Sequence, residues 1–166
     1  MNEKKNDIGK KTGAVICVIG RQHSGKTPVI QRMAKNSKFR NKVVYDKNKE
    51  YDPAEWSRFF SLSKFRKWLP EAKNCFIVME EATIYVRSVK ETVLTEQIIG
   101  IEHNRNVLVL VFHSLMDAPQ YVLRLCKFVV LLKTNDDPEQ IKTQRPRYYK
   151  FLNSDEDQYI NVNNLC

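Results

Sequence analysis

The chain has 166 residues, of which 42% are hydrophobic and 28% charged, which suits one globular domain with a sheet covered on both faces. No apolar run approaches the roughly 20 residues that span a bilayer, and the polar start Met1–Asp7 is unlike a signal peptide. Four cysteines without C-x-x-C spacing are expected to be reduced thiols. We therefore expect a cytoplasmic protein with no membrane span.

The formal net charge is +9 at pH 7. Such an excess of lysine and arginine favours a polyanionic partner, and DNA bound without sequence preference is one candidate. The basic residues are scattered along the chain, however, so solvated lysines would give the same total, and a nucleotide triphosphate is itself an anion. Charge alone therefore leaves nucleic-acid binding open.

Five short apolar runs alternate with helical patterns along the chain. The expected strands are residues 13–19, 43–46, 75–79, 107–112 and 128–132. The expected helices are residues 25–35, a stretch from Asp52 with Trp56, Phe59 and Phe60 on one face, 62–69, 88–104 and 119–125. Because strands that are apolar throughout are buried on both faces, this alternation predicts an α/β fold with a mainly parallel sheet.

The two ends of the chain differ from this central part. Residues 1–12 are polar and lysine-rich, which predicts a flexible basic tail. Residues 134–145 are polar and of mixed charge, which predicts a flexible loop, and residues 147–152 mix aromatic and charged side chains, which predicts an added edge strand. A second interpretation of residues 145–151 is a surface that stacks on single-stranded bases. We thus divide the chain into 1–12, a core 13–133 and a C-terminal part 134–166.

The octapeptide 20–27 fits the phosphate-binding pattern G-x-x-x-x-G-K-S/T at every fixed position, between an expected strand and an expected helix. Its glycines let backbone N–H groups surround phosphate oxygens at a helix N-terminus. Lys26 would contact the β- and γ-phosphates of ATP, and the Thr27 hydroxyl would bind Mg²⁺. For His23, we expect the backbone N–H to contribute more to phosphate binding than the imidazole ring does. The predicted nucleotide-binding residues are Gly20, Arg21, Gln22, His23, Ser24, Gly25, Lys26, Thr27 and Pro28.

Two adjacent acids, Glu80 and Glu81, follow the expected strand 75–79. They would lie at its C-terminal end, the edge of a parallel sheet where ligands bind and where the phosphate loop also opens. One acid suffices to hold Mg²⁺, and a second that points elsewhere could polarise the attacking water. We assign the metal to Glu80 together with Thr27, and the water to Glu81. The alternative is a solvated cap at the end of a strand.

Further features follow in an order that resembles a known group of ATPases. Val44–Tyr51 is a short strand ending in Asp with a nearby Glu, Ile77–Ala82 is a strand ending in two acids, and His103–Leu108 is a basic patch before a strand that ends at His113. In this order the chain resembles the additional-strand, catalytic-glutamate branch of P-loop NTPases, specifically the FtsK/HerA-type motors and the Zot-like phage assembly ATPases. That branch usually has Asp as the first acid and a polar sensor, often Gln, in place of the histidine.

The resemblance implies a three-layer α/β/α RecA-like P-loop ATPase core over residues 13–133, with strand order 5-1-4-3-2. Lys26 would then stabilise the γ-phosphoryl group, Glu81 would orient water, and His113 would contact the γ-phosphate or the water. Arg105 or Arg87 would act as an arginine finger on a neighbouring subunit. An ordinary surface arginine is the alternative for each.

The sequence leaves several functional alternatives open. The first is a DNA-translocating or genome-packaging motor of a phage or mobile element, working as a homo-oligomer in the cytoplasm of a bacterial cell or host, with a possible adaptor protein. The others are a Zot-like virion assembly or export ATPase, a nucleotide-dependent binding switch with little turnover, and a small-molecule kinase. For Asp46 and Glu50, a place near the nucleotide and a turn are both possible.

Overall fold

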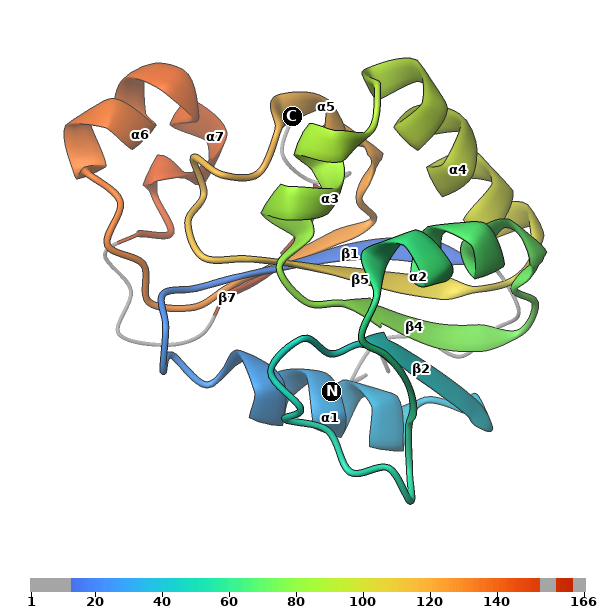
Figure 1. Ribbon diagram of the computed structural model, residues 1–166. Helices are drawn as coiled ribbons and strands as arrows, with labels where there is room; N and C mark the ends of the chain where they lie inside the picture. The colour runs from blue at the N-terminus through green and yellow to red at the C-terminus, as the bar shows by residue number, and fades with distance from the viewer. Residues whose placement is uncertain (1–12, 153–157, 163–166) are drawn as a thin grey trace, which may run out of the picture.

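Seven strands form one sheet in the computed structural model, which describes residues 13–152 and 158–162 (Figure 1). In chain order they are β1 (Ala14–Ile19), β2 (Asn41–Tyr45), β3 (Ser57–Phe59), β4 (Cys75–Met79), β5 (Val107–Phe112), β6 (Phe128–Leu131) and β7 (Gln158–Asn161). In space their order is β3-β2-β4-β5-β1-β6-β7. The predicted tail 1–12 lies outside the described residues.

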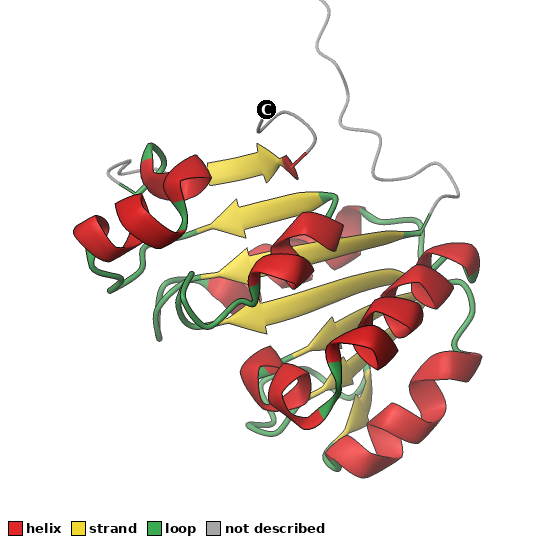
Figure 2. Cartoon of the chain, turned by 90° about the horizontal axis from the view of Figure 1, so that it is seen from above, coloured by secondary structure: helices red, strands yellow, loops and turns green. Residues whose placement is uncertain are grey.

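The five strands expected from the sequence occupy the middle of this sheet in the expected order. β5 lies between β1 and β4, and β6 and β2 flank them. All of these neighbours are parallel, whereas β7 runs antiparallel to β6, as the arrows in Figure 2 show. The prediction of a mainly parallel sheet in the order 5-1-4-3-2 is therefore confirmed, and β3 and β7 extend it by one strand at each edge.

Helices cover both faces of the sheet, which confirms the three-layer arrangement. On one face lies α1 (Lys26–Asn36). On the other lie α2 (Leu62–Trp68), the 3₁₀ helix η1 (Leu69–Glu71), α3 (Ala82–Ser88), α4 (Glu91–His103), α5 (Gln120–Leu125), α6 (Pro138–Gln144) and α7 (Pro146–Tyr149). Within the described residues, no helix combines the length and the hydropathy that crossing a bilayer requires.

Alternate residues of the central strands point to opposite layers, which explains why these strands are apolar throughout. In β1, Val15, Cys17 and Ile19 belong to the core shared with α2 to α7, and the residues between them belong to the core shared with α1. The residues of β4, β5 and β6 divide in the same way. Both faces of the sheet are thus sealed from water, and its C-terminal edge is left for ligands.

The stretch from Asp52 to Phe60 is a turn followed by β3, so the predicted helix is wrong there. The Asp52 carboxylate accepts a hydrogen bond from the backbone N–H of Ala54 at 2.9 Å, which holds the turn. Trp56 belongs to the core on the α1 side, whereas Phe59 packs against the opposite core. The aromatic residues expected on one helix face therefore point to opposite faces of the sheet.

The C-terminal part also differs from the expectation. The predicted loop 134–145 contains α6, because Pro138 begins a helical turn that Asp137 caps and Ile141 is buried against the core. The predicted edge strand 147–152 is wrong, since Pro146 begins α7 and the edge position belongs to β7. The sequence pattern also gave no sign of α3, which starts directly after the two acids.

Candidate nucleotide-binding site

Three parallel strands bring the predicted site residues to one edge of the sheet. The loop 20–25 follows β1, Glu80 and Glu81 follow β4, and His113 follows β5. Since β5 pairs with both β1 and β4 in parallel register, all three segments emerge at the C-terminal edge. The site is therefore a product of the strand order.

Backbone hydrogen bonds hold the phosphate loop against the ends of two neighbouring strands. The N–H of Gly20 donates to the carbonyl of Phe112 at 3.1 Å, and that of Arg21 donates to the carbonyl of Lys133 at 2.9 Å. Gly25 has a φ of 92°, in the left-handed region that favours glycine. At Gly20 a Cβ would lie 2.4 Å from Ser24 Oγ, so the loop can close this tightly only without a side chain. These are the two fixed glycines of the pattern.

The interior of the loop fits an anionic group. Ser24 Oγ is buried and has no hydrogen-bond partner among the described residues, which is costly unless a ligand supplies one. Lys26 Nζ donates to the carbonyls of Gly20 and Arg21, each at 2.8 Å, so its ammonium group lies over the loop. Burial lowers the pKa of Lys26, an effect that the carboxylates of Glu80, Glu81 and Glu50 oppose. A phosphate group would give both side chains a partner.

Thr27 contacts Glu50, for which the sequence left two interpretations open: a position near the nucleotide or a turn. Its hydroxyl donates to Glu50 Oε2 at 3.0 Å. The buried carboxylate of Asp46 accepts hydrogen bonds from the N–H groups of Glu50 (2.9 Å) and Tyr51 (3.2 Å), and so fixes the loop that carries them. Asp46 thus stabilises a turn, whereas Glu50 reaches the nucleotide site.

Glu80 is held by a residue that the sequence analysis did not single out. Its Oε1 accepts a hydrogen bond of 2.6 Å from the hydroxyl of Tyr51. Burial raises the pKa of Glu80 to about 7, although the Tyr51 hydrogen bond opposes the shift. Burial and the nearby carboxylate also raise the pKa of Tyr51, so Tyr51 stays a neutral donor. The spacing of Asp46 and Glu50 along the chain is the one signal that pointed towards this loop.

Glu81 points in a different direction from its neighbour. It has a φ of 56° and precedes the first residue of α3, a left-handed conformation that is strained for a glutamate. Its Oε1 lies 3.0 Å from Nε2 of His113 at the end of β5. The two acids are therefore positioned separately, Glu80 by Tyr51 and Glu81 by His113.

These side chains surround a cavity of about 240 Å³. Its charged lining residues are Lys26, Glu50, Glu80 and Glu81, and Gln22, His23, Gly25, Thr27, Pro28, Asn48 and His113 complete it. A wider cavity of about 760 Å³ shares Gln22, Glu81 and His113 with it and extends to Asn135 and Asp136. Within the described ranges, no three His, Cys, Asp or Glu side chains gather as a metal-binding group.

The two candidate arginine fingers lie outside this cavity. Arg105 has a φ of 58° in the turn between α4 and β5. That turn lies at the N-terminal edge of the sheet, since the flanking Asn106 carbonyl accepts from the N–H of Ala14 at the start of β1. Arg87 is exposed in the last turn of α3 and does not line the cavity either.

No protein-family model matches this sequence, and no curated protein sequence is significantly similar to it. Solved structures are similar to the whole molecule, however. The genome-packaging NTPase B204 from Sulfolobus turreted icosahedral virus 2, in complex with AMPPCP, aligns with a TM-score of 0.72 and 13% identity over 93% of this chain and 95% of that one. This chain has a P-loop NTPase fold. The DNA-packaging ATPase B204 from Sulfolobus turreted icosahedral virus gives a TM-score of 0.71 and 13% identity over 92% and 94% of the two chains.

A third structure, the N-terminal domain of zonular occludens toxin from Neisseria meningitidis, aligns with a TM-score of 0.55 at 13% identity. The alignment covers 90% of this chain and 93% of that domain. All three structures share the fold of this chain, and by TM-score the packaging NTPase is more similar to it than the toxin domain is.

Proposed function

We propose that this protein is a Mg²⁺-dependent ATPase that packages or moves the genome of a phage or mobile element. The observation that carries the proposal is the convergence of Lys26, Thr27 and two separately held acids around a phosphate loop whose buried Ser24 hydroxyl has no partner among the described residues. This is the set of groups that phosphoryl transfer to water requires. The higher similarity to the packaging NTPase than to the Zot domain supports packaging over export.

In the proposed mechanism the loop amides and Lys26 bind the β- and γ-phosphates. Lys26 would exchange the carbonyls of Gly20 and Arg21 for phosphate oxygens. Thr27 and Glu80 would hold Mg²⁺, which neutralises charge on the phosphates when bound. Glu81 would accept a hydrogen bond from the attacking water, and His113 would keep its carboxylate oriented.

The charge of the cavity supports a requirement for a divalent cation. Three glutamates and one lysine line it, so a triphosphate enters a site that is already rich in negative charge. Like charges that line one cavity repel one another. Mg²⁺ and the loop amides compensate part of this repulsion, and an arginine from a neighbouring copy would compensate more. We propose Arg105 for that role in a homo-oligomer.

DNA, bound without sequence preference, is the proposed polymer, and a separate adaptor protein is a further proposed partner. The proposed location is the cytoplasm of a bacterial cell or host. The net charge of +9 supports contact with phosphates.

The test is the rate of ATP hydrolysis with and without double-stranded and single-stranded DNA, in the presence and absence of Mg²⁺. We expect Mg²⁺-dependent release of phosphate that DNA stimulates. Hydrolysis that no DNA stimulates would favour a switch over a motor. Transfer of the γ-phosphate to a small molecule instead of water would identify a kinase.

A further inference from the structure

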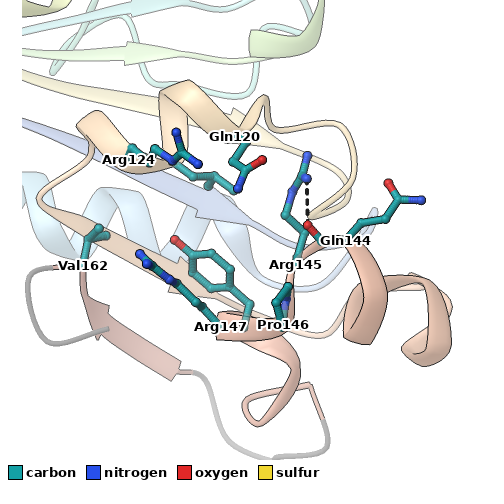
Figure 3. Close-up of a pocket in the computed structure, with 9 residues that line it drawn as sticks. Gln120, Arg124, Gln144, Arg145, Pro146, Arg147 and Val162 are labelled. Atoms are coloured by element: carbon teal, nitrogen blue, oxygen red, sulfur yellow. Dashed lines mark hydrogen bonds between the residues drawn. The ribbon is translucent and has the colours of Figure 1, made fainter. Parts of the chain in front are cut away.

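A second pocket lies between α5, α7 and the residue that follows β7 (Figure 3). It has a volume of about 120 Å³ and lies on the face of the sheet opposite α1 (Figure 1). Its floor is apolar, with Leu123 and Tyr148 buried. Three arginines form its walls: Arg124 from α5, Arg147 from α7, and Arg145 just before α7. No residue of the nucleotide cavity belongs to it.

Among the described residues that line this pocket, every charged side chain is basic and none is Asp or Glu. Arg124 and Arg147 are exposed, and neither has a hydrogen bond or ion pair within the described residues. Arg145 donates to the carbonyls of Gln144 (3.1 Å) and Ala118 (3.4 Å), contacts that leave its charge uncompensated. Burial raises the pKa of Tyr148 to about 12, so its hydroxyl adds no negative charge.

An anion with several oxygens fits this arrangement. The guanidinium group is planar, always charged and able to donate two parallel hydrogen bonds to a phosphate. The buried floor removes water from one side of the pocket, which strengthens the attraction of an anion to the walls. Gln120 also lines the pocket and carries an amide donor. A phosphate group is therefore the favoured ligand.

Two further basic side chains belong to α6 and to the residue that follows α7. Lys142 on α6 places its ammonium group 5.6 Å from the centre of the Tyr149 ring, and Lys150 lies 5.0 Å from that of Phe151. A single phosphate in the pocket would leave these lysines unused, whereas a chain of phosphates would contact them too. Because a lysine already covers each of these two rings, backbone phosphates are better ligands for this surface than stacked bases.

We propose that the arginine pocket binds a backbone phosphate of the nucleic acid on which this protein acts. The proposal rests on the proposed function, because it locates the surface that binds the DNA moved by the motor. The pocket formed by α5 and α7 contacts the nucleic acid. The hydrolytic site at the end of β1 is separate from this pocket.

The experiment compares Arg124→Gln/Arg147→Gln with Arg32→Gln/Lys35→Gln, a pair of exposed residues on α1 across the sheet. Each double variant removes two positive charges, from +9 to +7. Binding of a labelled duplex and of the matching single strand is measured by fluorescence anisotropy over a range of salt concentrations. We expect the pocket variant alone to lose affinity, with a slope of log K against log salt reduced by about 1 for duplex DNA. Its basal ATPase rate and melting temperature should stay at wild-type values.

Two results would overturn the proposal, and only the second would also overturn part of the proposed function. If the two double variants bind DNA with the same affinity as each other, the pocket does not contact the nucleic acid, and the proposed function stands. If the wild-type protein hydrolyses ATP but retains neither DNA form at low salt, the nucleic-acid part of the proposed function fails together with the pocket. Arg124→Lys/Arg147→Lys, which keeps the charge but not the paired donors of the guanidinium group, should recover only part of the lost affinity.

Discussion

The nucleotide cavity and the arginine pocket differ in both charge and restraint. The cavity holds three glutamates against one lysine; each glutamate is hydrogen-bonded to a residue from another segment, and the lysine to carbonyls of its own loop. In the described part of the chain, the pocket is lined by three arginines and no acid, and two of the arginines have no hydrogen bond or ion pair there. Chemistry on a phosphate needs groups held in place before the substrate arrives. Holding a polymer needs only charge of the right sign.

The shortage of positive charge in the cavity predicts the largest effect. Arg105→Ala should lower ATP turnover by roughly 10³–10⁵-fold, the value of an arginine finger, while ATP affinity is unchanged. Because Arg105 lies at the opposite edge of the sheet from its own cavity, the effect requires a neighbouring copy. Specific activity of the wild-type protein should therefore rise with protein concentration. Arg87→Ala is the matched control. A larger loss of turnover with Arg87→Ala than with Arg105→Ala would make Arg87 the arginine finger and Arg105 an ordinary surface residue.

The separate restraint of the two acids predicts that they are not interchangeable. Glu81→Gln should lower turnover by about 10²–10⁴-fold, the contribution of a positioned base, and should retain Mg²⁺-dependent ATP binding. Glu80→Gln should weaken that binding instead, since an amide is a poorer ligand for Mg²⁺ than a carboxylate. Single-turnover kinetics and titration with a fluorescent ATP analogue separate the two. The reverse pattern would exchange the roles of Glu80 and Glu81.

Burial of an acid in the cavity makes stability depend on pH, which the exposed arginines of the pocket cannot do. The pKa of Glu80 rises from 4.5 to about 7 on folding, so between these pH values the folded protein binds more protons than the unfolded chain. Its contribution to stability is therefore lost as pH rises through this window. Glu80→Gln has no such charge, so its melting temperature relative to wild type should be higher at pH 8 than at pH 5. Glu96→Gln, at an exposed position on α4, should show no such change.

The sequence predicted the parts of the site that depend on short segments. The phosphate loop and the acids after β4 are read from contiguous residues; the apolar runs located the five central strands, and their order in the sheet came from the resemblance alone. The partners of the site could not be predicted, because Thr27 to Glu50, Tyr51 to Glu80 and Glu81 to His113 are contacts between distant segments. Nothing in the local pattern specifies such pairs.

The sequence pattern predicted the wrong type of secondary structure in two segments where aromatic residues are closely spaced. Trp56 and Phe59 are three residues apart, which fits one face of a helix, yet the turn capped by Asp52 sends them to opposite cores. Around Tyr148, the mixture of aromatic and charged residues suggested a strand, but Pro146 starts a helical turn and burial of Tyr148 stabilises it. In both segments, packing against the core decided between two conformations that the local sequence allows.

Hydrolysis of ATP by Lys26→Ala, compared with wild type and with Lys35→Ala on the same helix, tests the central claim most directly. Among the described residues, Lys26 is the one cation that lines the cavity, so its loss should reduce phosphate release by at least about 10²-fold and weaken ATP binding, while circular dichroism should show that the fold is retained. Lys35→Ala, at an exposed position, should hydrolyse ATP at the wild-type rate. A folded Lys26→Ala protein with wild-type turnover would contradict the assignment of this protein as an ATPase.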